Sequence, residues 1–417
     1  MSLSRLVYDL FIRVYVTLIR LAALFNPKAR LWLQGRKDWR RRLREKISSG
    51  GVDLWIHCAS LGEFEQGRPV IEALREAHPS LRILLTFFSP SGYEVRKDYA
   101  LCDHVCYLPL DTVRNARDFL DIVKPRAVIF VKYEFWLHFI TELHQRAKPV
   151  VLVSAIFRQD QFFFRWYGRG FLPVLSYYER IFVQDERSRQ ILEAHRLTRV
   201  TVAGDTRFDR VGKIAAEARE VEGMKTFLGN ARTIVAGSTW PGDDEAILPC
   251  LAMADKWVIA PHEVNESRLR QLEKKLPADT VRYSRMVEDP EASRASKVLV
   301  IDNIGMLSAL YRYGRIAIIG GGFDHGIHNV LEAAVYGVPV LFGPKYQKFR
   351  EARDLIAVGG AFTAEGPGGF AEVLGKLAAE SFAANAGRVA GAYVLEQSGA
   401  TGKILDFLQQ KRFLTNA

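Results

Sequence analysis

Short apolar runs alternate with amphipathic stretches along most of the chain from about residue 51 onward. Runs of roughly 5–8 residues rich in β-branched and aromatic side chains, such as 53–60 and 81–89, predict buried strands. The stretches between them, such as 63–79 and 113–123, have the apolar spacing of helices. Strands that alternate with helices are typical of parallel βαβ units. A second series of the same kind starts near residue 231, so the pattern predicts an α/β fold with two similar halves.

The individual runs give the expected elements of each half. In the first half we expect further strands at 104–110, 125–136, 148–157, 179–185 and 199–205. In the second half we expect strands at 231–238, 256–262, 297–303, 315–322 and 338–344, with helices at 243–254, 306–314 and 329–337. The boundary lies in the charged, alanine-rich stretch 210–230. We therefore expect an N-terminal segment 1–46, a first domain 47–220 and a second domain 221–417.

Residues 5–25 predict a helix that lies on a membrane surface. One arc of this helix is polar and contains Arg5, Asp9, Arg13, Thr17 and Arg20. The opposite side carries Val7, Phe11, Val14, Leu18, Leu21 and Ala22. A central arginine costs roughly 2.5–3.5 kcal/mol in a spanning helix, so a helix in the interface is cheaper. No small-residue cleavage site follows, which argues against a signal peptide.

Most of the positive charge lies in the same segment. Residues 1–46 hold 12 lysines and arginines against three acidic residues, which is a net charge of +9 out of +11 for the chain. A nucleic-acid-binding domain usually spreads its basic residues over a folded face. The basic run 36–46, with Trp32 and Trp39 beside it, fits an anionic membrane better. We expect a membrane partner and no nucleic acid.

Cysteine and histidine spacing predicts no metal site. No pair among the four cysteines is followed by a second ligand pair at zinc spacing, so we expect reduced thiols at Cys58, Cys102, Cys106 and Cys250. His325 and His328 do not lie on one predicted helix, and no third ligand accompanies them.

Polar side chains follow three strands of the first half, where ligands of open parallel sheets bind. Glu63 begins a helix, where its carboxylate can take a proton from a sugar hydroxyl or merely stabilise the helix start. Lys132 and Glu134 either orient substrate charge or form an ion pair at the rim of the domain. Arg207 either holds a phosphate with two hydrogen bonds or is a solvated loop residue.

The strand ends of the second half favour an anion. Ser238 and Thr239 lie in a small-residue loop that enters a helix, where backbone N–H groups attract negative charge. The segment 319–334 contains a glycine run, which permits a close approach to the backbone, and Asn329 as a helix cap. Its spacing does not match the dinucleotide fingerprint GxGxxG. The alternative reading is a tight turn with an ordinary cap.

At these residues the chain resembles the family of Kdo (3-deoxy-D-manno-octulosonic acid) transferases along nearly its whole length. The family's SxGE motif is matched at 60–63 and its ETELWPN segment, in altered form, at 132–138. The GSLKFD and GSTxxGEE segments resemble 204–209 and 237–245. The PRH, TMGEL and GGHNxLE segments resemble 261–263, 303–307 and 326–332.

The resemblance implies a GT-B glycosyltransferase, with two Rossmann-like domains facing a cleft and a membrane-associated N-terminal helix. The implied reaction is transfer of Kdo from CMP-Kdo to a hydroxyl of the lipid A precursor lipid IVA, in lipopolysaccharide synthesis at the cytoplasmic side of the inner membrane. We expect inversion and no metal or cofactor. Glu63 matches the general base, and Arg207 matches a basic residue that stabilises the transition state. Including the small-residue loop, the expected CMP-binding residues are Ser238, Thr239, Pro261, His262, Ile304, Gly305, Met306, Asn329, Val330, Leu331 and Glu332.

Three positions depart from the family pattern. Lys132 stands where the family has an acidic residue assigned to transition-state stabilisation, so Glu134 is expected to carry more of that role. His262 replaces an arginine, which weakens two-point binding of phosphate. Met306 replaces a glutamate, whose contact is lost or made by another residue.

Two other functions remain compatible with the residues. One is a membrane-surface GT-B transferase that uses a UDP-sugar, which a competition between donors distinguishes from a Kdo transferase. The other is a non-catalytic protein that binds the membrane surface. This second reading does not explain why polar groups cluster at several strand ends.

Overall fold

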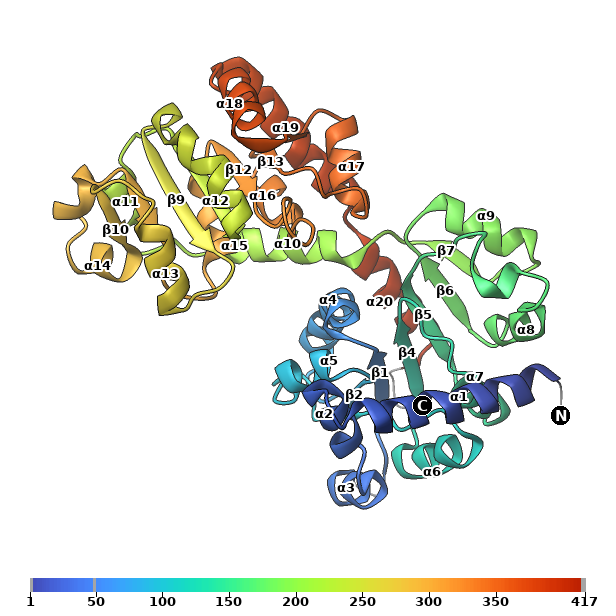
Figure 1. Cartoon of the computed structure of the whole chain (residues 1–417). Helices are drawn as coiled ribbons and strands as arrows, with labels where there is room; N and C mark the ends of the chain where they lie inside the picture. The colour runs from blue at the N-terminus through green and yellow to red at the C-terminus, as the bar shows by residue number, and fades with distance from the viewer. Residues whose placement is uncertain (1–2, 48–49, 414–417) are drawn as a thin grey trace. The chain divides into compact units, whose positions relative to one another are not determined.

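The chain folds into two compact units, shown in the computed structural model of Figure 1, which describes residues 3–47 and 50–413. Unit 1 consists of Met1–Asp209 with Gly399–Ala417, and unit 2 of Arg210–Ser398. Each unit contains a seven-stranded sheet in which all the paired strands are parallel. The predicted α/β fold with two similar halves is confirmed.

The sheet of unit 1 has the order β3-β2-β1-β4-β5-β6-β7. Its strands are β1 Leu54–Cys58, β2 Ile83–Phe87, β3 His104–Tyr107, β4 Ala127–Val131, β5 Val150–Ala155, β6 Arg180–Val183 and β7 Val200–Val202. The helices are α1 Leu3–Ala22, α2 Pro27–Gly35, α3 Trp39–Lys46, α4 Leu61–Ala77, α5 Pro90–Arg96, α6 Val113–Val123, α7 Leu137–Gln145, α8 Leu172–Leu175, α9 Glu186–Ala194, α10 Thr206–Glu217, which continues into unit 2, and α20 Ala400–Gln410. Two 3₁₀ helices, η1 Phe162–Phe164 and η2 Arg169–Phe171, precede α8.

Both faces of this sheet are buried, which explains why its central strands are continuously apolar. Along β1, Trp55 points into a cluster with α6 and α7, whereas Leu54 and Ile56 point into a cluster under α4. Because successive side chains of a strand point to opposite faces, one apolar run supplies two cores.

The sheet of unit 2 has the order β10-β11-β9-β8-β12-β13-β14. Its strands are β8 Thr233–Thr239, β9 Lys256–Pro261, β10 Thr280–Arg282, β11 Val298–Val300, β12 Ile316–Ile319, β13 Val340–Phe342 and β14 Ala361–Thr363. Its α-helices are α11 Met224–Leu228, α12 Pro241–Ile247, α13 Glu266–Glu273, α14 Tyr283–Glu288, α15 Leu307–Leu310, α16 Leu331–Ala334, α17 Arg350–Ala357, α18 Gly366–Leu377 and α19 Glu380–Gln397. The 3₁₀ helices are η3 Leu248–Met253, η4 Ala292–Ala295 and η5 Tyr311–Tyr313.

The unit boundary differs from the expected one in two ways. It lies between Asp209 and Arg210 rather than at 220, and the last residues of the chain belong to unit 1. The side chains of Ala400, Ile404 and Leu408 on α20 are buried in the core under α4. The carboxylate of Asp209 accepts hydrogen bonds from the backbone of Gly399 and Thr401, which fixes the start of α20. The expected second domain 221–417 was therefore wrong at its C-terminal end.

The expected N-terminal segment 1–46 is not a separate part, because it packs on unit 1. The hydroxyl of Tyr8 donates to Asp111 at 2.5 Å, and Nε2 of His138 lies 2.6 Å from the Asp9 carboxylate. Ile12 and Val16 are buried beneath α1. The apolar arc of α1 faces outward as expected, and Val7, Phe11, Val14, Leu18 and Leu21 are each about half exposed.

Part of the basic run is internal rather than exposed. The guanidinium of Arg36 donates to the carbonyls of Trp32, Phe88 and Leu108 and stacks on the Trp32 ring at 3.9 Å. Trp32 itself is only 4% exposed, which is incompatible with the expected place at lipid headgroups. Arg40 pairs with Asp118 at 2.6 Å. The exposed basic side chains of the run are those of Lys37, Arg41, Arg42, Arg44 and Lys46.

Candidate functional site

The candidate residues of unit 1 lie at the point where the strand order of its sheet reverses. The chain passes from β1 to β2 and β3 on one side and then returns to place β4 on the other side. In open parallel sheets ligands bind at the carboxyl ends of the strands at such a point. Glu63 follows β1, and both Lys132 and Glu134 follow β4. The sheet therefore brings two of the three predicted segments to neighbouring strand ends.

Glu63 lies in the first turn of α4, which begins directly after the N-cap residue Ser60. The Ser60 hydroxyl donates a hydrogen bond to Oε2 of Glu63 instead of capping a backbone N–H. Glu63 remains partly exposed, so its other oxygen can still accept a proton from a ligand. The serine and glutamate of the SxGE sequence thus form one local pair in which the serine orients the carboxylate.

Glu134 is buried, and its carboxylate is occupied by protein groups. It is 3% exposed, and its Oε2 lies 3.2 Å from Nε2 of His57 and accepts a hydrogen bond from the Trp136 ring N–H. The Tyr178 hydroxyl donates to the backbone carbonyl of Glu134. His57 is itself fully buried, and its Nδ1 lies 2.8 Å from Oγ1 of Thr86. Through its contact with His57, Glu134 connects the segment after β4 to β1.

Lys132 occupies an unusual backbone position at the end of β4. Its φ is 75°, in the left-handed region that non-glycine residues seldom adopt, and its N–H donates to Val153 at 2.8 Å. The Lys132 ammonium lies 5.4 Å from the centre of the Tyr133 ring. The left-handed backbone turns the chain away from the sheet immediately after the strand, and this sets the path on which Glu134 enters the interior.

Arg207 is held by a buried carboxylate that also contacts the helix of Glu63. Both Nε and Nη2 of Arg207 donate to Oδ2 of Asp205, at 2.9 and 2.8 Å. The side chain of Gln66, one turn after Glu63 on α4, lies 3.5 Å from the same oxygen, and the Thr206 hydroxyl donates to the Gln66 carbonyl. The fold thus joins the Arg207 segment, which follows the edge strand β7, to α4.

The candidate residues of unit 2 also surround a reversal of strand order, between β8 and β12. Here the glycines of the run lie against the backbone of neighbouring strand ends. A Cβ on Gly320 would lie 2.2 Å from the Ser238 carbonyl oxygen, and one on Gly322 would lie 2.5 Å from the backbone nitrogen of Gly343. The close approach that the structure shows is made by the backbone of neighbouring strand ends, and the approach of a ligand stays a prediction.

An aromatic cluster connects three strand ends of unit 2. The ring of His262 stacks on the rings of Trp240 and His328, with centroid distances of 4.6 and 4.4 Å. The Trp240 ring N–H donates to Nε2 of His328 at 3.1 Å. The pKa of His328 is lowered to about 4, first by burial and then by the neighbouring charge of His262. At neutral pH His328 is therefore uncharged, with its proton on Nδ1.

The carboxylate of Asp243 ties the start of α12 to the glycine run. Its Oδ2 accepts hydrogen bonds from the N–H groups of Trp240 and Gly321, at 2.8 and 2.7 Å. Burial is the main reason that its pKa is raised to about 6. The next residue, Asp244, forms a buried ion pair with Arg268 at 2.7 Å. Asp243 and Asp244 therefore both have internal partners.

A ligand at the segment 329–332 would meet mostly main-chain groups. The side chains of Val330 and Leu331 are fully buried, and the Leu331 N–H already bonds to Oδ1 of Asn329 at 3.2 Å. The amide of Asn329 donates to Glu332 at 3.0 Å. The helix that follows, α16, is only four residues long. Asn329 thus bonds the first N–H of a helix that is shorter than expected, but the N-cap residue of that helix is Val330 and not Asn329 as predicted.

The other expected CMP-binding residues are spread over neighbouring strand ends. Pro261 ends β9, and the N–H of His262 donates to the Thr239 carbonyl at 3.0 Å, which brings His262 to the end of β8. Ile304 and Gly305 lie in the exposed loop after β11, and Ile304 is 87% exposed. The sequence interpretation missed Trp240 and His57, although a tryptophan between a strand and a helix-starting proline is a recognisable signal.

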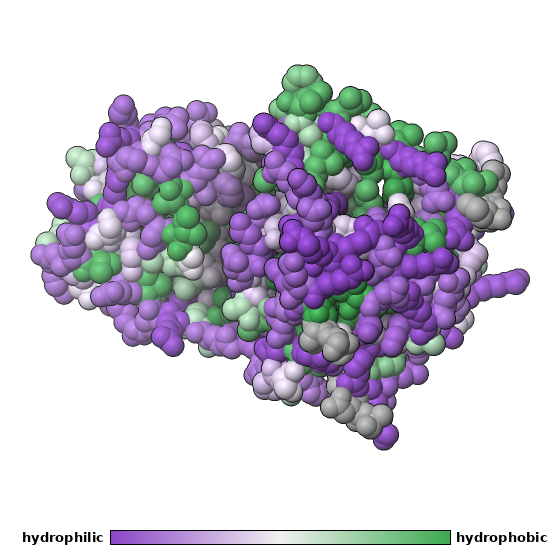
Figure 2. Space-filling model, turned by 90° about the horizontal axis from the view of Figure 1, so that it is seen from below, coloured by the Kyte–Doolittle hydropathy of each residue, from purple (hydrophilic) through white to green (hydrophobic). Residues whose placement is uncertain are grey.

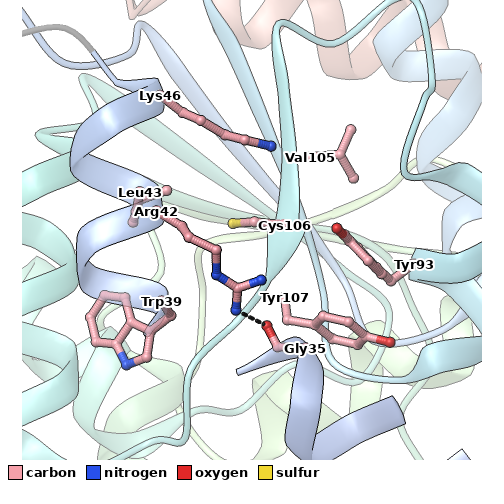
Figure 3. A pocket seen from close by; sticks show the side chains of 9 residues that line it. All are labelled: Gly35, Trp39, Arg42, Leu43, Lys46, Tyr93, Val105, Cys106 and Tyr107. Atoms are coloured by element: carbon pink, nitrogen blue, oxygen red, sulfur yellow. Dashed lines mark hydrogen bonds between the residues drawn. The ribbon is translucent and has the colours of Figure 1, made fainter. Parts of the chain in front are cut away.

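Other features of the described structure lie apart from these residues. A cavity of about 50 Å³ lies beside α3 and β3. Its lining side chains are drawn in Figure 3, and among them Arg42 donates to the Gly35 carbonyl at 2.7 Å. Burial raises the pKa of the Cys106 thiol that lines it to about 12. This volume is too small for a sugar nucleotide. Within residues 3–47 and 50–413, no group of three or more His, Cys, Asp or Glu side chains is arranged to hold a metal ion.

Comparison with known proteins identifies related chains. Residues 36–210 match the family described as 3-deoxy-D-manno-octulosonic-acid transferase (kdotransferase). The 3-deoxy-D-manno-octulosonic acid transferase of Aquifex aeolicus is 30% identical over 76% of this chain and 83% of its own length. The enzyme of the same name from Haemophilus influenzae is 26% identical over 89% of this chain and 91% of its own.

A solved structure extends the likeness to the whole fold. The structure of MurG from Acinetobacter baumannii superposes with a TM-score of 0.51 at 14% identity, covering 86% of this chain and 99% of that one. Both units, each with its own parallel sheet, take part in this likeness, so the fold class is GT-B as expected.

Proposed function

We propose a donor and an acceptor for this chain, which belongs to the 3-deoxy-D-manno-octulosonic acid (Kdo) transferase family and is a glycosyltransferase. The donor is CMP-Kdo, and the acceptor is a hydroxyl group of lipid IVA, a precursor of lipid A in lipopolysaccharide synthesis. The observation that carries the proposal is Glu63, a partly exposed carboxylate oriented by Ser60 at the reversal point of the unit 1 sheet.

The reaction needs a base, a positive charge and a site for the nucleotide. Glu63 removes the proton of the acceptor hydroxyl while that oxygen bonds to the anomeric carbon of Kdo. The bond between this carbon and the phosphate oxygen breaks, and CMP leaves with the electron pair. Displacement in a single step inverts the anomeric configuration. Arg207, kept in place by Asp205, and Lys132 stabilise the negative charge of the transition state.

We propose that the nucleotide binds at the strand ends of unit 2. The ring of His262 and the loop of Ser238 and Thr239 lie next to each other there, joined by the hydrogen bond from His262 to Thr239. A monophosphate leaving group can be stabilised by backbone N–H groups and a few side chains, so we propose a reaction without metal. Full activity in the presence of EDTA is the expected result, and loss of activity that Mg²⁺ restores would refute this part.

The protein attaches to the cytoplasmic side of the inner membrane through α1. No helix of the described residues is long and apolar enough to cross a bilayer. The outward arc of α1 carries half-exposed leucine, valine and phenylalanine side chains, and Figure 2 shows hydrophobic residues gathered along that edge of unit 1 beside a strongly hydrophilic surface. An open hollow of about 550 Å³, lined in part by the exposed Arg41 and Arg44, adds positive charge on α3. Such a surface suits an anionic bilayer.

Incubation with CMP-Kdo and lipid IVA, followed by mass analysis of the lipid, tests the reaction. We expect the lipid mass to increase by one or more Kdo residues and CMP to be released. NMR of the product reports the anomeric configuration. An unchanged lipid, or transfer from a UDP-hexose in a donor competition, would show that the donor or the acceptor is different.

A further inference from the structure

A loop rich in aromatic and arginine residues follows β5 and has no part in the reaction described above. Residues 158–171 include six aromatic side chains and three arginines against a single acidic residue, Asp160. Two of the aromatic side chains are strongly exposed, Trp166 at 83% and Tyr167 at 61%. Exposed aromatic residues that gather in one place mark an interaction surface.

The exposed rings project from a well-packed turn. Phe163 is buried in the core, and its ring lies 4.6 Å from that of Phe135. The turn passes so close to Phe162 that a Cβ on Gly168 would lie 1.7 Å from the Phe162 carbonyl oxygen. The Gly168 N–H donates to the Arg165 carbonyl at 3.0 Å. Trp166 and Tyr167 lie inside this turn, so the fold itself presents them to solvent.

The loop packs beside α1, on the side of that helix that faces unit 1. The ring of Phe171 lies 6.1 Å from that of Tyr8 on α1 and 5.3 Å from that of Phe162. Ring contacts therefore hold the aromatic loop next to α1. The apolar arc of α1 sets which side of the helix faces the bilayer. A second contact beside the helix would limit how far unit 1 rocks about the helix axis.

The charge of the loop indicates which partner it fits. Arg158, Arg165 and Arg169 are all exposed, and Arg165 and Arg169 flank Trp166 and Tyr167 in the sequence. Tryptophan and tyrosine favour the headgroup level of a bilayer, and arginine favours its anionic phosphates. We propose that residues 158–171 form a second contact with an anionic lipid surface, in which Trp166 and Tyr167 insert among the headgroups and Arg165 and Arg169 bind lipid phosphates. The inference rests on the proposed membrane attachment through α1.

Vesicle binding by the full-length protein tests the proposal. Trp166→Ala with Tyr167→Ala should lower affinity roughly tenfold for vesicles of phosphatidylcholine with phosphatidylglycerol and also for phosphatidylcholine alone, because apolar contact is lost in both. Arg165→Gln with Arg169→Gln should lower affinity roughly 10–30-fold for the anionic vesicles only. Phe382→Ala, which changes an exposed aromatic residue of unit 2, is the matched control and should have no effect.

Two further readouts separate this inference from the proposed function. Brominated lipids should quench the fluorescence of the parent protein more than that of Trp166→Phe. Transfer to acceptor dissolved in detergent should be the same in all variants, because the loop is outside the catalytic residues. If the parent protein binds vesicles but the aromatic double variant binds equally well, the loop is not a lipid contact. If the parent protein itself does not bind vesicles, attachment through α1 fails as well.

Discussion

Asp243 and His328 respond to pH in opposite directions although they follow neighbouring strands of unit 2, β8 and β12. Burial raises the pKa of the aspartate to about 6 and lowers that of the histidine to about 4. Both shifts favour the uncharged form. Ionisation of Asp243 therefore destabilises the fold as pH rises, whereas protonation of His328 destabilises it as pH falls. The two effects offset each other between about pH 4 and 6.

Replacing Asp243 by Asn isolates the first effect. The folded state holds the aspartate proton more tightly than the unfolded state, whose pKa is near 3.8. The stabilising contribution is complete below this value and is lost as pH rises through 6. We expect the free energy of unfolding of the parent protein, relative to Asp243→Asn, to fall by about 2–3 kcal/mol between pH 4 and pH 7. Denaturant unfolding at several pH values measures it, and a difference independent of pH would contradict it.

His328 can be followed directly by NMR of its ring. We expect it to titrate near pH 4. In Trp240→Phe the hydrogen bond that the indole N–H donates to Nε2 is absent, and the neutral ring loses that support. The pKa should therefore rise by roughly half a unit to one unit. A histidine signal for this position that titrates at 6.5 in the parent protein would overturn the assignment of a buried, neutral ring.

At the scale of elements, the central strands of unit 2 depend on glycine at their carboxyl ends. Gly320→Ala places a methyl group 2.2 Å from the Ser238 carbonyl oxygen, where neither backbone can move freely within the sheet. We expect a loss of about 1–3 kcal/mol or more in the free energy of unfolding. Gly402→Ala on α20 is the control, because nothing lies within 4 Å of its added Cβ, and it should stabilise by about 0.5–1 kcal/mol. Equal stability of the two variants would contradict this reading of the glycine run.

The sequence pattern predicts the central elements well because their positions follow from burial. The strands β1, β2 and β4 are buried along their whole length, and each was expected from its apolar run. The strands β10 and β14 were missed because each is three residues long and lies at an edge, where side chains are partly exposed. The helix expected at 329–337 is confined to 331–334.

Local sequence patterns could not predict contacts between distant parts of the chain. Glu63 was found because a family motif and a strand end coincide at that residue. The burial of Glu134 against His57 depends on two strands that lie side by side but are about 75 residues apart in the sequence. The return of α20 to unit 1 depends on Asp209 and on the core under α4. Neither of these two contacts produces a periodic pattern of apolar residues in the sequence.

At the scale of the whole molecule, attachment to the membrane should depend on the outward face of α1. Leu10, Phe11 and Leu18 are each about 60% exposed. Replacing all three by glutamine should reduce binding to anionic vesicles at least 100-fold, since each buried apolar side chain contributes roughly 1.5–3 kcal/mol. The melting temperature should stay unchanged because these side chains face solvent. Sedimentation with vesicles at the level of the parent protein would contradict the attachment.

Deleting residues 1–25 is a less clean test of the same attachment. The deletion should also release the protein from membranes, but it removes the bond from Tyr8 to Asp111 and the ion pair of Asp9 with His138. We therefore expect a lower melting temperature for the deletion than for the triple substitution. High salt should weaken vesicle binding of the parent protein only in part, because apolar burial is not screened.

The rate of Kdo transfer by Glu63→Gln tests the central claim most directly. Glutamine keeps the size of the side chain and can still accept the Ser60 hydrogen bond, but it cannot take a proton from the acceptor hydroxyl. We expect turnover to fall by about 10²–10⁴-fold, with CMP affinity nearly unchanged because the proposed nucleotide site is in unit 2. If Glu63 merely stabilises the start of α4, the variant should lose about 0.3–1 kcal/mol of stability and keep its activity. Near-normal turnover with a lowered melting temperature would contradict the assignment of Glu63 as the catalytic base.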